Sequence, residues 1–205
     1  MKFKDDATGN DGVFDPGSNT VGLSIKGLGR ESLKLSGYYF GLIEKNGIDT
    51  HFISLDMDNA AMTVKPARPF GKGLEVICRF KAVGSFYRRY GGYVAEGQDL
   101  GGFVEMTFKD DARQDPPVTR ECLVMLGVMT DEIYNRCCSL AKEIALIIKG
   151  DLAGKGLELY DIKFEFGVAD GKVILIDEIS GGNMRVYRNG AFVQPMELAD
   201  LVLLT

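Results

Sequence analysis

A predicted β-hairpin constrains the fold of this chain more than any other feature. Its first strand, Leu157–Phe166, alternates apolar and charged side chains, which places the charged ones on one face of a sheet. Its return strand, Lys172–Ile179, contains a continuous apolar run, which is typical of a strand that is buried on both faces. The segment Ala169-Asp170-Gly171 is a turn signal between the two. The hairpin therefore predicts an antiparallel sheet with a charged face.

The length of the turn decides whether this hairpin forms a site. With a three-residue turn in which Gly171 is left-handed, Asp177 falls opposite Lys163 and diagonal to Glu165. Two carboxylates and a lysine in one patch have the chemistry that a Mg²⁺–triphosphate group requires. A two-residue turn would put Asp177 on the other face and remove the patch. The alternative interpretation is a solvated strand face with ordinary ion pairs.

Basic residues gather in the segment 79–89, RFKAVGSFYRR, although the chain carries a net charge of -5. Within it, Gly84-Ser85 precedes a predicted short helix, a place where backbone N–H groups bind anions, and arginines bind phosphate oxygens with two donors. Arg185 follows Gly181-Gly182 and is a further candidate anion ligand. The alternative for each of these features is an ordinary basic surface.

The composition excludes several classes of function. The 24 Lys and Arg residues are outnumbered by 29 Asp and Glu, which argues against a nucleic-acid binder with a broad basic face. One histidine, His51, is too few for a multi-histidine metal site, and its strand-like context favours a structural role. The four cysteines form no C-x-x-C pair and are expected to be reduced packing residues. The chemistry is left to carboxylates, lysines and arginines.

The remaining pattern mixes helices and strands without regular βαβ alternation, which predicts an α+β fold in two lobes. The predicted helices span 31–46, 84–92, 131–153 and 195–204, and the predicted strands span 51–55, 62–65, 74–80 and 103–108. We expect an antiparallel-sheet N-terminal lobe over 1–78 and a mixed helix and sheet lobe over 79–205. Asp15-Pro16-Gly17 is a further turn signal. No segment has the length of a membrane span or the character of a signal peptide, so a cytoplasmic protein is expected.

Six motifs, in their order along the chain, resemble the SAICAR synthetase family. They are FKDDATG (3–9), GIDTHFI (47–53), RFKAVGSFYRRYG (79–91), FKDDARQDPP (108–117), DIKFEFG (161–167) and IDEISGGNMR (176–185). The resemblance covers nearly the whole chain. It implies a two-lobed α+β ligase with ATP in the cleft between the lobes. Such an enzyme joins L-aspartate to the carboxylate of carboxyaminoimidazole ribonucleotide through an acyl phosphate, with release of ADP and phosphate, in de novo purine biosynthesis.

The resemblance also implies roles for eight residues. Glu165 and Asp177 look like Mg²⁺–ATP ligands, and Lys109 and Lys163 look like phosphate contacts that take part in catalysis. The remaining four resemble ribonucleotide contacts, and the one aspartate among them resembles the acidic catalytic group that faces the imidazole: Arg79, Ser85, Arg185 and Asp115. The family further implies a homodimer that binds small molecules and neither nucleic acid nor membrane.

Two departures from the family pattern leave alternatives open. Family members usually begin with a strand pair of the G-K-x-K type, whereas this sequence begins in the segment that leads to Asp5-Asp6. Ser180-Gly181-Gly182 stands where the family usually has Ser-Pro-Asp. One alternative is a non-catalytic nucleotide-binding or regulatory protein on the same fold. The other is an ATP-dependent ligase that uses a different carboxylate or amine.

Overall fold

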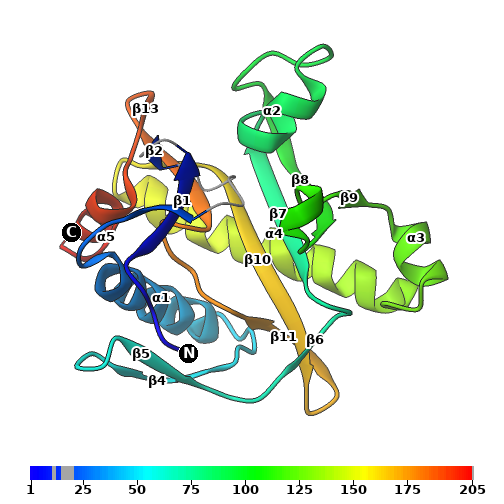
Figure 1. Cartoon of the computed structure of the whole chain (residues 1–205), viewed down its shortest axis with the longest axis horizontal. Helices are drawn as coiled ribbons and strands as arrows, with labels where there is room; N and C mark the ends of the chain where they lie inside the picture. Colours follow the sequence, from blue (N-terminus) through cyan, green and yellow to red (C-terminus); the bar gives the residue numbers. More distant parts are fainter. Residues whose placement is uncertain (11–12, 15–20, 205) are drawn as a thin grey trace.

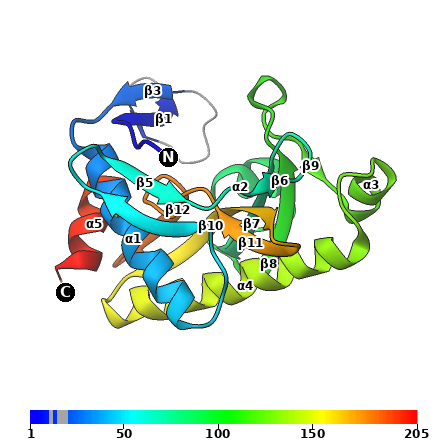
Figure 2. The same ribbon diagram turned by 90° about the horizontal axis from the view of Figure 1, so that it is seen from below.

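An eight-stranded antiparallel sheet forms the centre of the molecule (Figure 1; Figure 2 gives the view turned by 90°). This computed structural model describes residues 1–10, 13–14 and 21–204. Along its main path the sheet contains β13 (Ala191–Phe192), β12 (Met184–Arg188), β10 (Glu158–Ala169), β7 (Leu74–Lys81), β8 (Asp99–Phe108) and β9 (Pro117–Val118). The distal half of β10 also pairs with β11 (Lys172–Ile176) and β6 (Arg68–Pro69). The long strand β10 is thus paired along both of its edges.

The longest helix, α4 (Asp131–Gly154), covers one face of this sheet (Figure 2). Thr130 caps the helix as predicted, because its hydroxyl accepts a hydrogen bond of 3.3 Å from the Ile133 N–H. The helix and the strands share a core whose buried members include Leu140, Ile144, Ile148, Val76, Cys78, Met106, Ile162 and Phe164. Since side chains alternate along a strand, the charged residues of the same strands lie on the opposite face.

A second group of elements lies beside the sheet (Figure 1). Helix α1 (Leu28–Lys45) packs against α5 (Pro195–Leu203) and against the hairpin of β4 (Phe52–Asp56) and β5 (Ala61–Val64). A small sheet contains β2 (Val13–Phe14), β1 (Asp6–Asn10) and β3 (Val21–Ser24). The connections of the central sheet carry α2 (Gly84–Tyr90), a 3₁₀ turn (Asp111–Arg113) and α3 (Arg120–Met125).

Asp5 holds the N-terminal segment against the start of α1. Its carboxylate accepts hydrogen bonds from the N–H groups of Gly27 and Gly29, both at 3.0 Å, and these bonds lower the pKa of Asp5. A side chain at Gly29 would lie 2.9 Å from the backbone of Lys4, so the close approach of the two segments requires a glycine. The N-terminal residues are thereby fixed where they form one wall of the cavity described below.

The turn of the predicted hairpin is shorter than expected. Ala169 pairs with Lys172, so the turn contains only Asp170 and Gly171, and the three-residue turn is wrong. Both turn residues have positive φ, 51° and 76°, as a two-residue type I′ turn requires. This turn matches the right-handed twist of the flanking strands, which explains why the shorter loop forms. The return strand ends at Ile176, three residues before its predicted end.

The α+β class is confirmed, and the remaining differences are mostly at element boundaries. Helix α1 begins three residues earlier than predicted, and β8 begins at Asp99 rather than at residue 103. The strand predicted over 74–80 belongs to the central sheet, and the expected lobe boundary after residue 78 falls inside it. The two-lobe division at that position stays a prediction. The predicted turn at 15–17 lies outside the described residues. Of the helices described, none is both long and apolar enough to span a membrane.

The turn geometry predicts opposite effects of one substitution at two glycines. Gly171→Ala must keep φ near 76°, so the free energy of unfolding should fall by about 1 kcal/mol. Gly150→Ala, inside α4, should leave it unchanged or raise it by up to about 1 kcal/mol, because alanine favours a helix. Among the residues that the structure describes, no atom lies within 4 Å of either added methyl group. Urea unfolding measures both changes, and equal effects would contradict the assigned turn.

Candidate active site

The face of the sheet opposite α4 is lined with paired charges from three neighbouring strands. The register places Glu165 beside Glu75 and Asp161 beside Arg79, and strand alternation puts Lys163 on the same face. The charges fall into two groups along the strands, one around Glu165 and one around Asp161. The solvated-face interpretation does not describe this surface, because Arg79 and Asp161 are fully buried.

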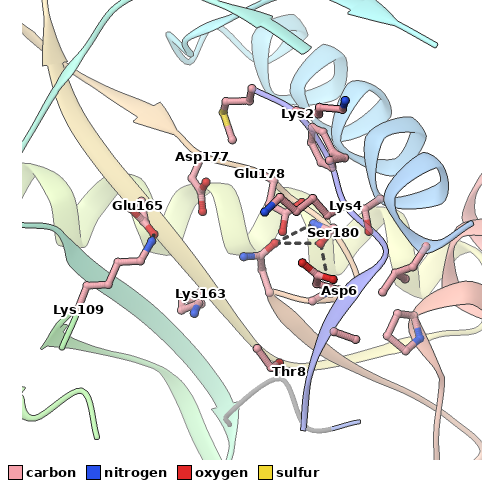
Figure 3. Close-up of a pocket in the computed structure, with 18 residues that line it drawn as sticks. Lys2, Lys4, Asp6, Thr8, Lys109, Lys163, Glu165, Asp177, Glu178 and Ser180 are labelled. Atoms are coloured by element: carbon pink, nitrogen blue, oxygen red, sulfur yellow. Dashed lines mark hydrogen bonds and ion pairs between the residues drawn. The ribbon is translucent and has the colours of Figure 1, made fainter. Parts of the chain in front are cut away.

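In the first group two lysines are held by two carboxylates. Lys109 Nζ lies 2.6 Å from Glu165 Oε1, and Lys163 Nζ lies 2.6 Å from Glu75 Oε1 (Figure 3 shows Lys109 reaching Glu165). The Thr107 hydroxyl donates a 2.9 Å hydrogen bond to the other oxygen of Glu75. The lysine side chains are partly exposed, 49% for Lys109 and 29% for Lys163, so a ligand reaches both of them.

Asp177 joins this first group by a route that differs from the predicted one. Glu165 pairs with Ile176, so in a continuing strand Asp177 would point to the α4 face. The strand ends instead, and Asp177 adopts a left-handed conformation with φ of 66°. Its side chain lines the same cavity as Glu165 and Lys163 (Figure 3). The patch therefore exists despite the two-residue turn, and the inference that such a turn removes it is wrong.

A cavity of about 360 Å³ separates this charged face from the N-terminal segment (Figure 3). The sheet side and the residues after β11 contribute the charged groups Lys109, Lys163, Glu165, Asp177 and Glu178. Residues 1–4 and 6–8 form much of the remaining wall, and Leu28, Ser180, Gly182 and Pro195 also line it. The cavity thus combines paired charges with apolar surface, as a site for an organic phosphate requires.

Burial and mutual repulsion destabilise the negative charge of the carboxylates here. The pKa of Glu165 is raised by burial and by the nearby charge of Asp177, against the opposing effect of Lys109. The same two causes raise the pKa of Glu178 to about 7. Burial lowers the pKa of Lys109, but its hydrogen bond and attraction to Glu165 outweigh that effect and raise it. An added cation beside these acids would relieve the repulsion.

The donor set fits a magnesium ion that shares its coordination with a ligand. Carboxylate oxygens are ligands that Mg²⁺ prefers. Within the described part of the chain, no three or more His, Cys, Asp or Glu side chains are grouped to hold a metal by themselves. Mg²⁺ is commonly held by one or two carboxylates together with substrate phosphates. Glu165 and Asp177 are the residues that would hold such an ion.

The second group centres on two arginines that share one carboxylate. Arg79 Nη1 lies 2.8 Å from Asp161, and Arg185 Nη1 lies 2.8 Å from the same oxygen. Arg79 also donates through Nε to Glu105 at 2.7 Å and through Nη2 to the Ser85 hydroxyl at 3.0 Å. Arg79 is only 1% exposed. Three of the predicted ribonucleotide contacts, Arg79, Ser85 and Arg185, are thus brought together by the fold.

Gly84 allows Arg185 to reach this group. Its φ is 55°, and a side chain there would lie 2.5 Å from the guanidinium carbon of Arg185. Glycine therefore serves both the left-handed backbone and the close approach of the arginine. Glu105 accepts a further 2.6 Å hydrogen bond from Arg89 and so ties α2 to β8.

The predicted Asp115 lies in the connection after β8, and its carboxylate accepts a 2.7 Å hydrogen bond from the Asp110 N–H. Its backbone is left-handed, with φ of 46°. Burial is the main cause that raises the pKa of Asp115, and the charges of Glu75 and Asp111 add to it.

Three acidic residues were missed by the sequence-based site prediction, namely Glu75, Glu105 and Glu178. Asp161 was expected on the charged face of the hairpin but was given no role in the site. A signal was present for Glu75, which is a lone acid in an apolar strand and has the same parity as Arg79, so both face the same way. The contribution of residues 1–4 and 6–8 to the cavity depends on contacts that are distant in sequence.

The chain is similar to proteins of one known family. The family model described as SAICAR synthetase matches residues 1–197. The phosphoribosylaminoimidazole-succinocarboxamide synthase of Clostridium tetani is 52% identical over 99% of this chain and 90% of its own length. The enzyme of that name from Thermotoga maritima is 36% identical over 93% of this chain and 78% of its own length. A solved structure described as SAICAR synthetase (type 2) in complex with ADP superposes with a TM-score of 0.86 and 28% identity, over 100% of this chain and 90% of that one.

The charge network predicts a large loss of stability from a small change. Asp161→Asn removes the negative charge between two arginines, at a side chain that is 3% exposed, and should lower the free energy of unfolding by about 3 kcal/mol. Asp99→Asn breaks a pair with Lys81 at a side chain that is 70% exposed and should change it by at most about 0.5 kcal/mol. Urea unfolding compares the variants. If Asp161→Asn left the free energy of unfolding unchanged, this would contradict a stabilising role for the carboxylate.

The raised pKa of Glu178 predicts a pH dependence of stability. Between the ordinary value of 4.5 and the folded value of about 7, the folded protein keeps a proton that the unfolded chain releases. This group therefore makes the free energy of unfolding fall as the pH rises through that window. Glu178→Gln should reduce the fall between pH 5 and 7.5 by on the order of 2 kcal/mol. Urea unfolding in EDTA measures the free energy of unfolding at each pH. Glu143→Gln, at an exposed site, is the control for the loss of one carboxylate and should leave the pH dependence unchanged.

Proposed function

The chain belongs to the SAICAR synthetase family, and from this premise we propose that it joins L-aspartate to the carboxylate of carboxyaminoimidazole ribonucleotide at the expense of ATP. It is an ATP-dependent ligase of purine biosynthesis. The observation that carries the detailed proposal is the cavity wall, where two lysines and two carboxylates, Lys109, Lys163, Glu165 and Asp177, face one space. A related structure holds ADP, which supports a nucleotide in this fold.

The reaction follows from the chemistry of its reactants. A carboxylate is a poor acyl donor, so it first attacks the terminal phosphorus of ATP, which gives an acyl phosphate and releases ADP. The amine of aspartate then attacks the acyl carbon, the amide bond forms, and phosphate leaves with the bonding electrons while the amine loses a proton. The protein has to align three reactants and stabilise charge on phosphoryl oxygens. Neither a histidine nor a thiol is required.

At the nucleotide end the lysines exchange partners. We assign the phosphates to Lys109 and Lys163, which leave Glu165 and Glu75 when a more highly charged ligand arrives. Glu165 and Asp177 are then available to hold Mg²⁺. When bound, the ion neutralises charge on the phosphate oxygens. The two lysines provide the remaining positive charge around the transferred group.

At the other end the arginine group binds the ribonucleotide. Ser85 and Arg185 contact its phosphate with their side chains. The buried Arg79 positions Ser85 by a direct hydrogen bond and Arg185 through the shared carboxylate of Asp161. Asp115 faces the imidazole in this assignment. Its carboxylate is fixed by the Asp110 N–H, which leaves its second oxygen for a substrate donor.

The alternatives are less well supported. A non-catalytic nucleotide-binding protein is not favoured, because relatives that match 99% and 93% of the chain carry the name of the enzyme. Gly181, at the departure from the family pattern, lies so close to Pro195 that a side chain would come within 2.7 Å of it. The glycine therefore has a packing reason of its own. We further propose a homodimer of the 22.5 kDa chain and a cytoplasmic location, where phosphorylated intermediates are retained.

Coupled detection of ADP tests the proposal. ADP should be released in proportion to product only when ATP, aspartate and the ribonucleotide are all present, and a panel of other amino acids should be inactive. When the carboxylate of the ribonucleotide carries ¹⁸O, one labelled oxygen should appear in the released phosphate per turnover. Activity with a different amino acid, or unlabelled phosphate, would refute the assigned substrate or the acyl phosphate respectively.

The metal assignment predicts the effect of two isosteric substitutions. Glu165→Gln and Asp177→Asn should each lower kcat/KM for ATP by about 10²- to 10³-fold, because each removes an anionic ligand of the ion that neutralises the phosphates. Both variants should keep the circular dichroism spectrum of the parent. Asp58→Asn, at an exposed turn between β4 and β5, is the matched control and should retain the parent rate. Parent turnover in either site variant would overturn the assignment.

A further inference from the structure

The single histidine of the chain lies behind the site rather than in it. His51 is 4% exposed, and its ring Nε2 lies 2.9 Å from the backbone carbonyl oxygen of Asp177. A carbonyl oxygen only accepts hydrogen bonds, so Nε2 carries the proton and donates it. The ring thus contacts the backbone of the residue whose side chain enters the cavity.

A partner on the backbone of Asp177 can select its conformation. Aspartate is among the few residues with a side chain that adopt the left-handed region as single residues, but it also adopts the extended conformation of a strand. In that extended conformation the strand register would turn the carboxylate toward α4, away from Glu165. A donor at a fixed position on the Asp177 carbonyl sets the plane of the peptide that follows this residue. It therefore favours the observed backbone conformation, in which the carboxylate lines the cavity.

Backbone hydrogen bonds fix the segment that carries the His51 ring. The His51 N–H donates to the carbonyl of Leu175 at 3.0 Å, and the Lys65 N–H donates to the carbonyl of His51 at 2.7 Å. Thr50 pairs with Leu175 in a parallel bridge, so this segment lies along the free edge of β11. The ring of Phe40 lies 5.4 Å from the imidazole, centroid to centroid. The Nε2–H donor of His51 is thus attached to a segment that pairs with β11, the strand that Asp177 follows.

We propose that His51 is a positioning residue for the ligase reaction, which holds Asp177 in the left-handed conformation that directs its carboxylate to the metal and phosphate end of the site. The inference rests on the proposed function for the role of Asp177. His51 itself touches neither substrate nor metal. Its loss should affect the nucleotide end selectively, because Asp161 and Glu105 hold the ribonucleotide end independently.

Two substitutions separate the hydrogen bond from the packing of the ring. His51→Phe keeps an aromatic ring against Phe40 but removes the donor, whereas His51→Gln keeps an N–H donor. In the ADP assay His51→Phe should raise the Mg²⁺ concentration for half-maximal rate by about tenfold and lower kcat by a similar factor, with KM for the ribonucleotide changed less than twofold. His51→Gln should recover most of both losses. An unchanged Mg²⁺ requirement in folded His51→Phe, or equal defects in both variants, would overturn the proposal.

Asp177→Asn distinguishes this inference from the proposed function. In that background His51→Phe should add little, because both changes act through one carboxylate. If Asp177→Asn alone leaves the Mg²⁺ requirement unchanged, the metal assignment fails. If Asp177→Asn is defective while His51→Phe is not, or if the two defects multiply, the inference about His51 alone fails.

The protonation of the His51 ring can be measured on the unaltered protein, so this test does not depend on the folding of a variant. Nitrogen-15 spectra of the single histidine report which ring nitrogen carries the proton. The proposal predicts the Nε2–H tautomer at neutral pH, with that proton protected from exchange with water. A ring protonated on Nδ1 alone, or an Nε2 proton that exchanges at the rate of an exposed histidine, would overturn it.

Discussion

The buried guanidinium of Arg79 is the constraint on which the rest of the site depends. A charge with 1% exposure is tolerated only when its donors are met by charged or polar partners, since its desolvation is costly. Those partners come from three elements: Asp161 on β10, Glu105 on β8 and Ser85 on α2. Meeting them fixes the register of the central strands and the position of α2. The same carboxylates then hold Arg185 and Arg89, so one buried cation organises the whole arginine group.

The two ends of the site differ in how easily their ion pairs can be exchanged. Around Arg79 the partners are buried, and separating them would leave an uncompensated charge. Around Lys109 and Lys163 the pairs are partly exposed, and pairs of this kind contribute little to stability. A triphosphate with its metal offers these lysines more negative charge than a single carboxylate does. In the proposed assignment, the buried arginine group is the end that binds the ribonucleotide, and the partly exposed lysine pairs are the end that binds the nucleotide.

Much of the charged face was readable from the sequence, because strand alternation is local information. Strand alternation placed Asp161, Lys163 and Glu165 on one face. The ordered motifs predicted that Arg79, Ser85 and Arg185 belong to the same site. The turn length was wrong, because Asp170 adopts a positive φ that its residue type permits but does not require. Asp177 reaches the predicted patch because it adopts a left-handed conformation itself, which the periodicity of the sequence does not reveal. The role of Glu105 and the wall formed by residues 1–4 and 6–8 depend on long-range pairing, and for this reason only the structure reveals them.

In the function proposed above, the carboxylates and lysines of this cavity form a site for ATP together with Mg²⁺. Calorimetric titration of ATP into the chain, once with Mg²⁺ and once with EDTA, tests that assignment. Binding should be at least about tenfold tighter with Mg²⁺, because without the ion the carboxylates of Glu165 and Asp177 repel the triphosphate. Equal affinity in EDTA, or no binding in either titration, would contradict the claim.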